Sequence, residues 1–196
     1  MKVVGVVLAA GGSTRFGDNN KLLAPLQGRS LVSYAVDALK ASPVEAHAVV
    51  LGHEAEAVRA TLSEFDGVVL FNAQWAAGMA TSLHCAVHWA RDHIGASHLL
   101  VMLGDMPCVT AAHISSLTEN AVSHPTKIVR AVHGGTAGNP VIVPAIAFDA
   151  LLALKGDEGA RALVRQGFGT VDVELDDAVR TDIDTPDALA GVIPAA

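Results

Sequence analysis

An apolar, β-branched run at residues 3–8 ends abruptly in two adjacent glycines, Gly11 and Gly12. Such a run is typical of a strand buried on both faces, because branched side chains favour extended backbone and fill a covered sheet. A glycine-rich loop directly after a buried strand lets backbone N–H groups approach an anion closely. Arg15 and Lys21 add cationic donors to the same loop. The segment predicts an α/β fold with a phosphate-binding first loop.

Further apolar runs alternate with helical patterns along the chain. Strands are expected at residues 3–8, 46–51, 68–71, 98–103, 128–132, 141–143 and 171–175, and helices at 30–40, 54–62, 80–91, 110–122, 145–154 and 157–166. This alternation predicts right-handed βαβ units, and therefore a three-layer, doubly wound, mostly parallel sheet of Rossmann-like type. Residues 133–140 interrupt the alternation and are interpreted as a substrate-facing loop. The chain, residues 1–196, is expected to form a single domain.

Composition narrows the class of protein. Hydrophobic residues make up 51% of the chain and aromatic residues only 4%, so the core must be aliphatic. The formal charge of −7, without a basic tail or stripe, argues against nucleic acid or an anionic membrane as the main partner. Cys85 and Cys108 form no C-x-x-C pair and fit a reducing compartment. The first apolar run is too short to span a membrane and lacks a signal-peptide layout, so a cytoplasmic protein is expected.

Two common phosphate loops do not fit the glycine-rich segment. Gly12 and Gly17 have the spacing of a P-loop, but Asp18 and Asn19 stand where Lys and Ser or Thr are required. The adjacent Gly11 and Gly12 also break the G-x-G-x-x-G spacing of a dinucleotide-binding loop. An ordinary glycine-rich turn with two surface cations remains the plain alternative.

Carboxylates follow two later segments. Asp105 lies in Leu-Gly-Asp-Met-Pro directly after the strand expected at 98–103, where a carboxylate suits Mg²⁺ bound to substrate phosphates. Asp182 and Asp184 share one side if the backbone between them is extended. Each group has a plain alternative: Asp105 as a turn residue capping the helix near Thr110, and Asp184 as part of a helix start at Pro186.

Other polar residues give weaker indications. Ser82 lies in Gly-Met-Ala-Thr-Ser-Leu at the start of a helix, where it caps the helix or contacts an anion. His84 and His88 share a helix face and have zinc-ligand spacing, but packed or surface histidines are the favoured interpretation because no third ligand is evident. Cys108 has no base partner in the sequence and is assigned no chemistry.

The loop, the Gly-Asp-Met-Pro segment and the Asp-Ile-Asp-Thr-Pro segment together resemble the MobA-like nucleotidyltransferases, nearest the molybdenum cofactor cytidylyltransferase branch. The loop matches the family pattern at these residues: Leu8, Ala9, Gly11, Arg15, Phe16, Gly17 and Lys21. The resemblance runs in family order from residue 8 to residue 189. It implies the nucleotide-diphospho-sugar transferase fold and transfer of a nucleoside monophosphate from an NTP to molybdopterin, with release of pyrophosphate.

The resemblance also implies residue roles. Arg15, Lys21 and Asp105 are the expected catalytic residues, and Asp105 and Asp184 are the expected Mg²⁺ ligands, with Asp182 as second choice. Nucleotide-binding residues are expected to be Leu8, Ala9, Ala10, Gly11, Gly12, Arg15, Lys21 and Gly52. The second substrate is expected to meet Ser82, Gly138, Asn139 and Pro140. Asn139 replaces the histidine of the family's G-H-P motif, which leaves the acceptor open.

Several functions remain open on the sequence. Ala10 stands where the cytidylyl branch has alanine, so CTP is favoured over GTP. A sugar-phosphate nucleotidyltransferase shares the first loop. Some MobA-like proteins are assigned oxidoreductase chemistry with a nicotinamide cofactor, which the loop spacing disfavours. A non-catalytic cofactor chaperone would not need Arg15, Lys21, Asp105 and Asp184 together. A recipient molybdoenzyme is an expected partner.

Overall fold

A seven-stranded sheet forms the centre of the chain in the computed structural model, which describes residues 1–13, 15–17 and 19–194. The strand order is β5-β4-β1-β6-β8-β7-β9. The strands are β1 (Val3–Ala9), β4 (Ala46–Leu51), β5 (Val68–Phe71), β6 (His98–Leu103), β7 (Ile128–His133), β8 (Thr136–Pro144) and β9 (Thr170–Glu174). A separate two-stranded ribbon pairs β2 (Pro25–Leu26) with β3 (Arg29–Ser30).

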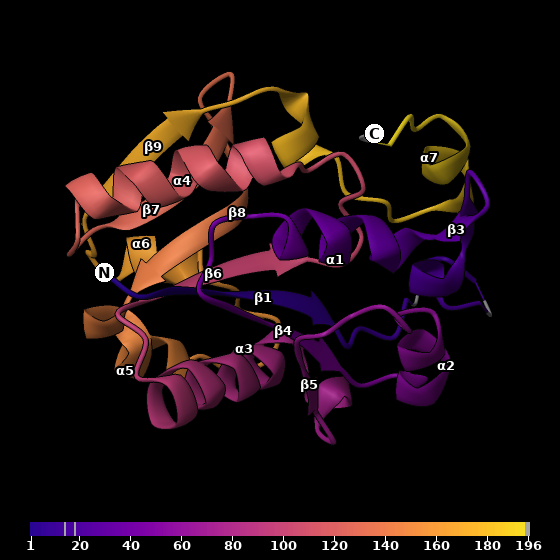
Figure 1. Cartoon of the computed structure of the whole chain (residues 1–196), viewed down its shortest axis with the longest axis horizontal. Helices are drawn as coiled ribbons and strands as arrows, with labels where there is room; N and C mark the ends of the chain where they lie inside the picture. The colour runs from indigo at the N-terminus through magenta and orange to yellow at the C-terminus, as the bar shows by residue number, and fades with distance from the viewer. Residues whose placement is uncertain (14, 18, 195–196) are drawn as a thin grey trace.

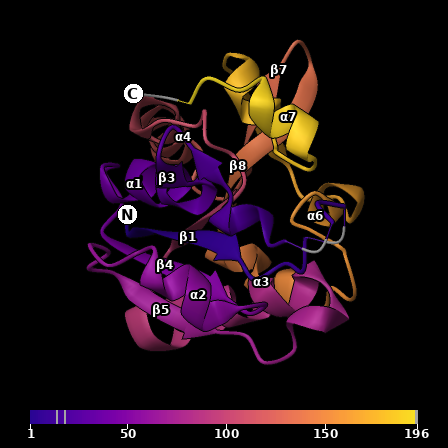
Figure 2. The same ribbon diagram turned by 90° about the vertical axis from the view of Figure 1, so that its right-hand side faces the viewer.

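Parallel pairing dominates the half of the sheet around β1. β1 runs parallel to both β4 and β6, and β4 runs parallel to β5. The register places Leu8 opposite Val50 and Leu103, so the carboxyl ends of three strands lie at one edge. Figure 2 faces this edge and places α7 above β1 and α2 below it. Loops that follow parallel strands meet at such an edge, which is where ligands bind in open α/β sheets.

Helices cover both faces of the sheet (Figure 1). The helices of the chain are α1 (Leu31–Lys40), α2 (Ala55–Ala60), α3 (Met79–His88), α4 (Ala111–Ser123), α5 (Phe148–Leu152), α6 (Ala162–Arg165) and, at the edge of the sheet, α7 (Pro186–Ala190). Alternate residues of β1 enter the two cores: Val4 and Val6 pack with α3 and α5, and Val7 packs with α1 and α4. The predicted three-layer, doubly wound, mostly parallel sheet is therefore confirmed.

Gly5 permits a close approach of α1 to β1. A Cβ atom added at Gly5 would lie 2.3 Å from Cδ1 of Leu39, a fully buried side chain of α1. The absence of a side chain at this strand position thus lets the helix pack directly on the centre of the sheet.

The interpretation of residues 133–140 as a loop is wrong. β7 and β8 form an antiparallel hairpin that turns at Gly134 and Gly135, and β8 already begins at Thr136. Both glycines have positive φ, 56° and 74°, which a two-residue hairpin turn favours. Glycine and proline made the segment look like a loop, although Gly138, Asn139 and Pro140 all lie within β8. β8 also pairs antiparallel with β6, which places the hairpin inside the sheet.

The two helices expected at 145–154 and 157–166 are much shorter in the structure. A 3₁₀ turn precedes α5, and α6 contains only four residues. Glycines at 156 and 159 flank the charged pair Asp157 and Glu158, and this segment stays outside helical structure. The segment is consequently free to line a cavity, as described below.

A small third core joins the first loop to the C-terminal segment. Phe16 and Ile183 are both buried there, together with Leu26, Leu31 and Tyr34. The backbone N–H of Ile183 also donates to the carbonyl of Asp105 at 3.0 Å. Since Arg15 adjoins Phe16 and the acids 182 and 184 flank Ile183, this packing brings the polar residues of three segments together.

Candidate active site

A cavity of about 620 Å³ opens at the carboxyl ends of β1 and β6. Its walls come from the glycine-rich loop, the start of α3, the loop after β6, and the segment before α7. The lining residues are Leu8, Ala9, Ala10, Gly11, Gly12, Ser13, Arg15, Lys21, Leu22, Trp75, Ala76, Gly78, Met79, Ser82, Leu103, Gly104, Asp105, Asp157, Asp182 and Asp184. The cavity therefore brings together every residue expected to bind nucleotide or metal except Gly52.

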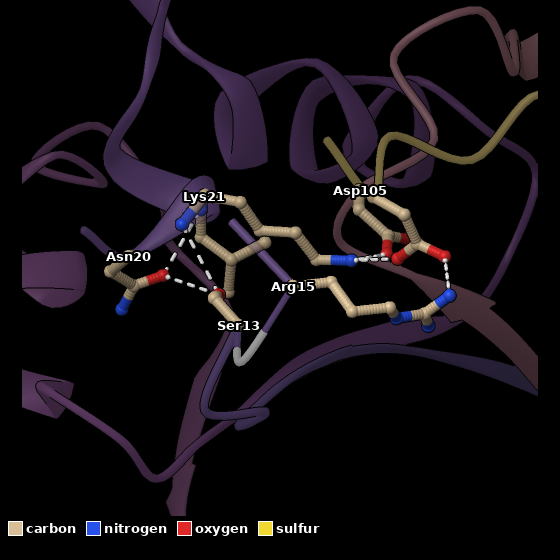
Figure 3. A network of polar contacts seen from close by, with 7 residues as sticks. Ser13, Arg15, Asn20, Lys21 and Asp105 are labelled. Carbon is tan, nitrogen blue, oxygen red and sulfur yellow. Dashed lines mark hydrogen bonds and ion pairs between the residues drawn. The ribbon is translucent and has the colours of Figure 1, made fainter. Parts of the chain in front are cut away.

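Lys21 lies at the centre of a charged cluster in this cavity (Figure 3). Its Nζ donates to Oδ2 of Asp105 at 2.5 Å and to Oδ1 of Asp184 at 2.8 Å. Arg15 pairs with the other oxygen of Asp184, Oδ2, at 2.6 Å. The Lys21 side chain is only 15% exposed, whereas that of Arg15 is 74% exposed. Lys21 is thus the fixed cation of the site, and Arg15 extends from its rim.

Three carboxylates form the acidic side of the cluster. Oxygens of Asp105, Asp182 and Asp184 all lie within 4.8 Å of one another. Oδ1 of Asp105 is buried and finds no hydrogen-bond partner among the residues that the structure describes. A buried carboxylate oxygen without a partner is costly, and hard oxygen donors in this arrangement suit a divalent cation. The donor set fits Mg²⁺ or Mn²⁺ shared with substrate phosphates.

Burial and charge act in opposite directions on the ionisable groups. Burial raises the pKa of Asp105 above its ordinary value, and the ammonium of Lys21 offsets this only in part. Burial also opposes ionisation of Asp184, but Lys21 and Arg15 together hold the pKa of Asp184 below its ordinary value. For Lys21, the two carboxylates outweigh burial and raise the pKa. Lys21 and Asp184 therefore remain charged at neutral pH.

Neither Asp105 nor Asp184 caps the helix that follows it. Thr110 caps α4, accepting from the backbone N–H of His113. Thr185 caps α7 in the same way, with Pro186 at the first turn. The capping alternatives considered for Asp105 and Asp184 therefore do not account for these carboxylates, which point into the charged cluster instead.

A hydrogen-bonded clasp fixes the backbone at Lys21. The backbone N–H of Lys21 donates to the Ser13 hydroxyl at 3.1 Å, and that of Leu22 donates to Oδ1 of Asn20 at 3.0 Å. The Ser13 hydroxyl also contacts Asn20 Oδ1 at 3.4 Å (Figure 3). Asn20 is buried, so its carbonyl oxygen replaces water as the acceptor for the Leu22 N–H and the Ser13 hydroxyl. The sequence assigned no role to Ser13 or Asn20, because their contact with each other forms only in the folded loop.

Gly52 lies behind the cavity wall. A Cβ atom added there would meet Trp75 at 2.5 Å and Ala10 at 2.9 Å, and both of these residues line the cavity. The backbone N–H of His53 donates to the Ala10 carbonyl at 3.1 Å, which ties the two loops together. Gly52 thus supports the wall through close packing. Trp75 was not anticipated from the sequence.

A second cavity, of about 590 Å³, adjoins the first. The two share the wall residues Leu8, Met79, Leu103, Asp157 and Asp182. Gly138 and Asn139 line the second cavity, whereas Ser82 lines the first and accepts a hydrogen bond from Asn72. Pro140 follows them on β8 and is buried. Asp157 lines both cavities. Its position between Gly156 and Gly159, soon after a helix, is the sequence feature that could have indicated this.

The histidine pair and Cys108 lie outside these cavities. His88 contacts Asp92 at 3.0 Å, and Cys108 donates to the Ile193 carbonyl. Within the described part of the chain, the three aspartates form the one group of three or more potential metal ligands. The two histidines and Cys108 therefore have no part in the proposed chemistry.

A doubly wound sheet with a glycine-rich first loop, paired cations and an acidic cluster defines a nucleotide-binding α/β protein. The MobA-like NTP transferase domain model matches residues 5–172. The chain belongs to this family, which confirms the resemblance inferred from the motifs.

Curated relatives match along almost the whole chain. Nicotine blue oxidoreductase of Paenarthrobacter nicotinovorans is 33% identical, with 93% of this chain and 92% of the relative covered. Purine catabolism protein PucB of Bacillus subtilis is 29% identical, with 94% and 93% covered.

A solved structure of similar sequence contains a divalent metal. It is the manganese complex of Rv0371C from Mycobacterium tuberculosis, with a TM-score of 0.79 and 30% identity over 98% of this chain and 100% of that chain. A nucleotidyl transferase from Methanothermobacter has a TM-score of 0.82 at 23% identity, with 96% of this chain and 94% of that chain covered, and supports the fold. In the described part of the chain, no helix has the length and apolarity needed to cross a membrane.

Proposed function

We propose that this protein transfers CMP from CTP to a molybdopterin-type acceptor and releases pyrophosphate. The observation that carries the proposal is the acidic cluster at the junction of two adjoining cavities. Asp105 and Asp184 line the first cavity, and Asp182 lines both. A reaction that joins two substrates at one phosphorus needs such a junction.

The first cavity is assigned to the nucleotide. Backbone groups of residues 8–12 would read the base, with Ala10 against it and Gly52 behind that wall. Lys21 and Arg15 would bind the triphosphate, because both are cationic donors that line the same cavity as the acids. Asp105 and Asp184 would hold Mg²⁺, with Asp182 beside them.

The chemistry requires charge neutralisation and alignment. When bound, Mg²⁺ would stabilise charge on the phosphates of the reacting nucleotide. The attacking phosphate monoester has a second pKa of about 6 and is largely dianionic at neutral pH. A catalytic base is therefore unnecessary, and the protein contributes in-line positioning together with the charges of Lys21 and Arg15.

The nucleotide triphosphate would replace the carboxylates as partner of Lys21. In the structure the Lys21 ammonium bridges Asp105 and Asp184, which are the proposed metal ligands. A divalent cation at these acids would offset the negative charge that holds Lys21, and a triphosphate would offer Lys21 new anionic oxygens. Binding of a metal–nucleotide complex would therefore release Lys21 from the acids toward the phosphates.

Two other functions have specific support. GTP is the alternative donor, since an added methyl at residue 10 distinguishes bases only by shape. Oxidoreductase chemistry is suggested by the name of the 33% identical relative. Against it, the first loop lacks dinucleotide spacing, and the cluster of Lys21, Arg15 and three carboxylates suits phosphates better than a nicotinamide.

The test is a pyrophosphate-release assay with purified protein, Mg²⁺, molybdopterin or its molybdenum-loaded form, and each NTP in turn. We expect release that depends on both the acceptor and the metal, fastest with CTP. Release of pyrophosphate with a sugar 1-phosphate but not with molybdopterin would show that the acceptor is a sugar phosphate. Oxidation of a nicotinamide cofactor without any release of pyrophosphate would show that the protein is an oxidoreductase instead.

A further inference from the structure

Four arginines line the second cavity, and they are not equivalent. They are Arg130, Arg161, Arg165 and Arg180. Arg130 forms a bidentate ion pair with Asp172, with hydrogen bonds of 2.8 and 2.7 Å. Arg165 lies 3.9 Å from Glu158. For Arg161 and Arg180, no carboxylate of a described residue lies within ion-pair distance.

Contacts with β8 place both arginines near one strand position. The guanidinium of Arg161 donates to the Ala137 carbonyl at 2.9 Å. Next along β8, Gly138 packs so tightly against the turn Asp177–Arg180 that an added Cβ would lie 2.0 Å from the Val179 carbonyl oxygen. Arg161 thus contacts the residue before Gly138, Arg180 follows the residue packed against Gly138, and both arginines line the second cavity together with Asn139.

Each of these arginines is also close in sequence to an acid at the junction of the two cavities. Arg161 follows Asp157 by four residues, and Arg180 precedes Asp182 by two. Asp157 and Asp182 line both cavities. The cationic pair consequently lies on the acceptor side, next to the place where the two substrates must meet.

We infer that Arg161 and Arg180, with Asn139, form the binding site for the phosphate monoester of the acceptor. This inference rests on the proposed function and adds the residues that recognise the nucleophile. Guanidinium groups suit phosphate because their planar N–H donors match two oxygens at once. A phosphate monoester carries nearly two negative charges. It would therefore give both arginines the anionic partner that no described carboxylate provides within ion-pair distance. Asn139 adds a neutral amide donor in place of a titratable ring.

The direct test uses phenyl phosphate as the probe, with the nucleotide cavity saturated by Mg²⁺ and α,β-methylene-CTP. Binding is followed by ³¹P NMR in the parent and in Arg161→Ala, Arg180→Ala and the double variant. Loss of one charge-assisted contact should weaken binding about ten-fold or more. Arg165→Ala is the matched control, because this arginine lines the same cavity beside Glu158, and its affinity should stay within about two-fold of the parent.

A kinetic test with molybdopterin separates binding from structural damage. KM for the acceptor should rise about ten-fold or more in each alanine variant while KM for CTP stays unchanged, and Arg161→Lys should restore part of the loss. Equal phosphate affinity in parent and double variant, or no binding to the parent, overturns the inference. Arginine-dependent binding of phenyl phosphate without turnover of molybdopterin would instead overturn the proposed acceptor and keep the phosphate site.

Discussion

The two cavities lie side by side and share wall residues of β1 and β6, but the rest of their walls differ in structure and charge. The cavity proposed for the nucleotide is completed by the glycine-rich loop, and its cations, Lys21 and Arg15, are already paired with carboxylates. The cavity proposed for the acceptor extends over the antiparallel strand β8 and irregular segments around residues 157–161 and 177–182, and two of its arginines have no carboxylate of a described residue within ion-pair distance. On the proposed function, one cavity would exchange its ion pairs for a metal and phosphates, and the other would receive an anion directly.

The largest expected effect tests the acidic side of the nucleotide cavity. Asp105→Asn should lower kcat/KM by about 10²-fold or more, because a neutral amide cannot hold a divalent cation against bridging phosphates. Steady-state pyrophosphate release at saturating Mg²⁺ measures this loss. Asp92→Asn, an exposed surface change, is the matched control and should retain parent activity. Near-parent turnover of a folded Asp105→Asn protein would remove Asp105 from the metal site.

A second change compares the fixed and the exposed cation. Lys21→Ala should reduce kcat/KM by about 10- to 100-fold, since each charge-assisted contact to phosphate contributes on the order of 1.5–3 kcal/mol. Arg15→Ala should cost less because the Arg15 side chain is largely exposed. Lys21→Arg should restore only part of the activity. If both alanine variants keep the parent kcat/KM, the glycine-rich loop has a structural role only.

A third change concerns the choice of base. Ala10→Gly should increase GTP use relative to CTP by about ten-fold, because shape discrimination of this kind is worth about 1–3 kcal/mol. Competition between the two nucleotides in one assay measures the ratio. Ala9→Gly, at the neighbouring wall residue, serves as the comparison. A parent enzyme that prefers GTP, or an unchanged ratio in the Ala10 variant, would contradict the cytidylyl assignment.

The smallest change tests the clasp that holds Lys21. Asn20→Ala should lower the free energy of unfolding by about 1–2 kcal/mol, because the buried N–H of Leu22 loses its acceptor. It should also raise KM for CTP a few-fold while leaving KM for the acceptor unchanged. Thermal unfolding and steady-state kinetics measure the two effects. Asn120→Ala, on α4, should leave both KM values at parent levels, and equal shifts in the two substrates' KM values would argue against a local role for Asn20.

The sequence was most informative about the parallel half of the molecule. Long apolar runs and glycine-rich turns have clear periods, so β1, β4, β6, α1 and α4 lie close to their expected ranges. The residues that line the first cavity could also be predicted, because loops after parallel strands must meet at one edge of the sheet. Of the residues expected there, only Gly52 lies behind the cavity wall.

The antiparallel half was harder to predict for physical reasons. The Gly134–Gly135 hairpin turn and Gly138 made a strand look like a loop, although tight packing against Val179 requires the glycine. The arginines at 161 and 180 stand in segments without periodicity, and only the fold brings them to Gly138. The clasp of Ser13 and Asn20 likewise depends on three-dimensional contacts between ordinary loop residues.

The central claim is that a nucleoside monophosphate crosses the acidic junction from one cavity to the other. The most direct measurement follows label from [α-³²P]CTP into molybdopterin and counts pyrophosphate in the same reaction. The account predicts one labelled product for each pyrophosphate, no transfer by Asp105→Asn, and reduced transfer by Arg161→Ala at limiting acceptor. Pyrophosphate without labelled acceptor, or labelled acceptor in equal yield from the Asp105 variant, would contradict it.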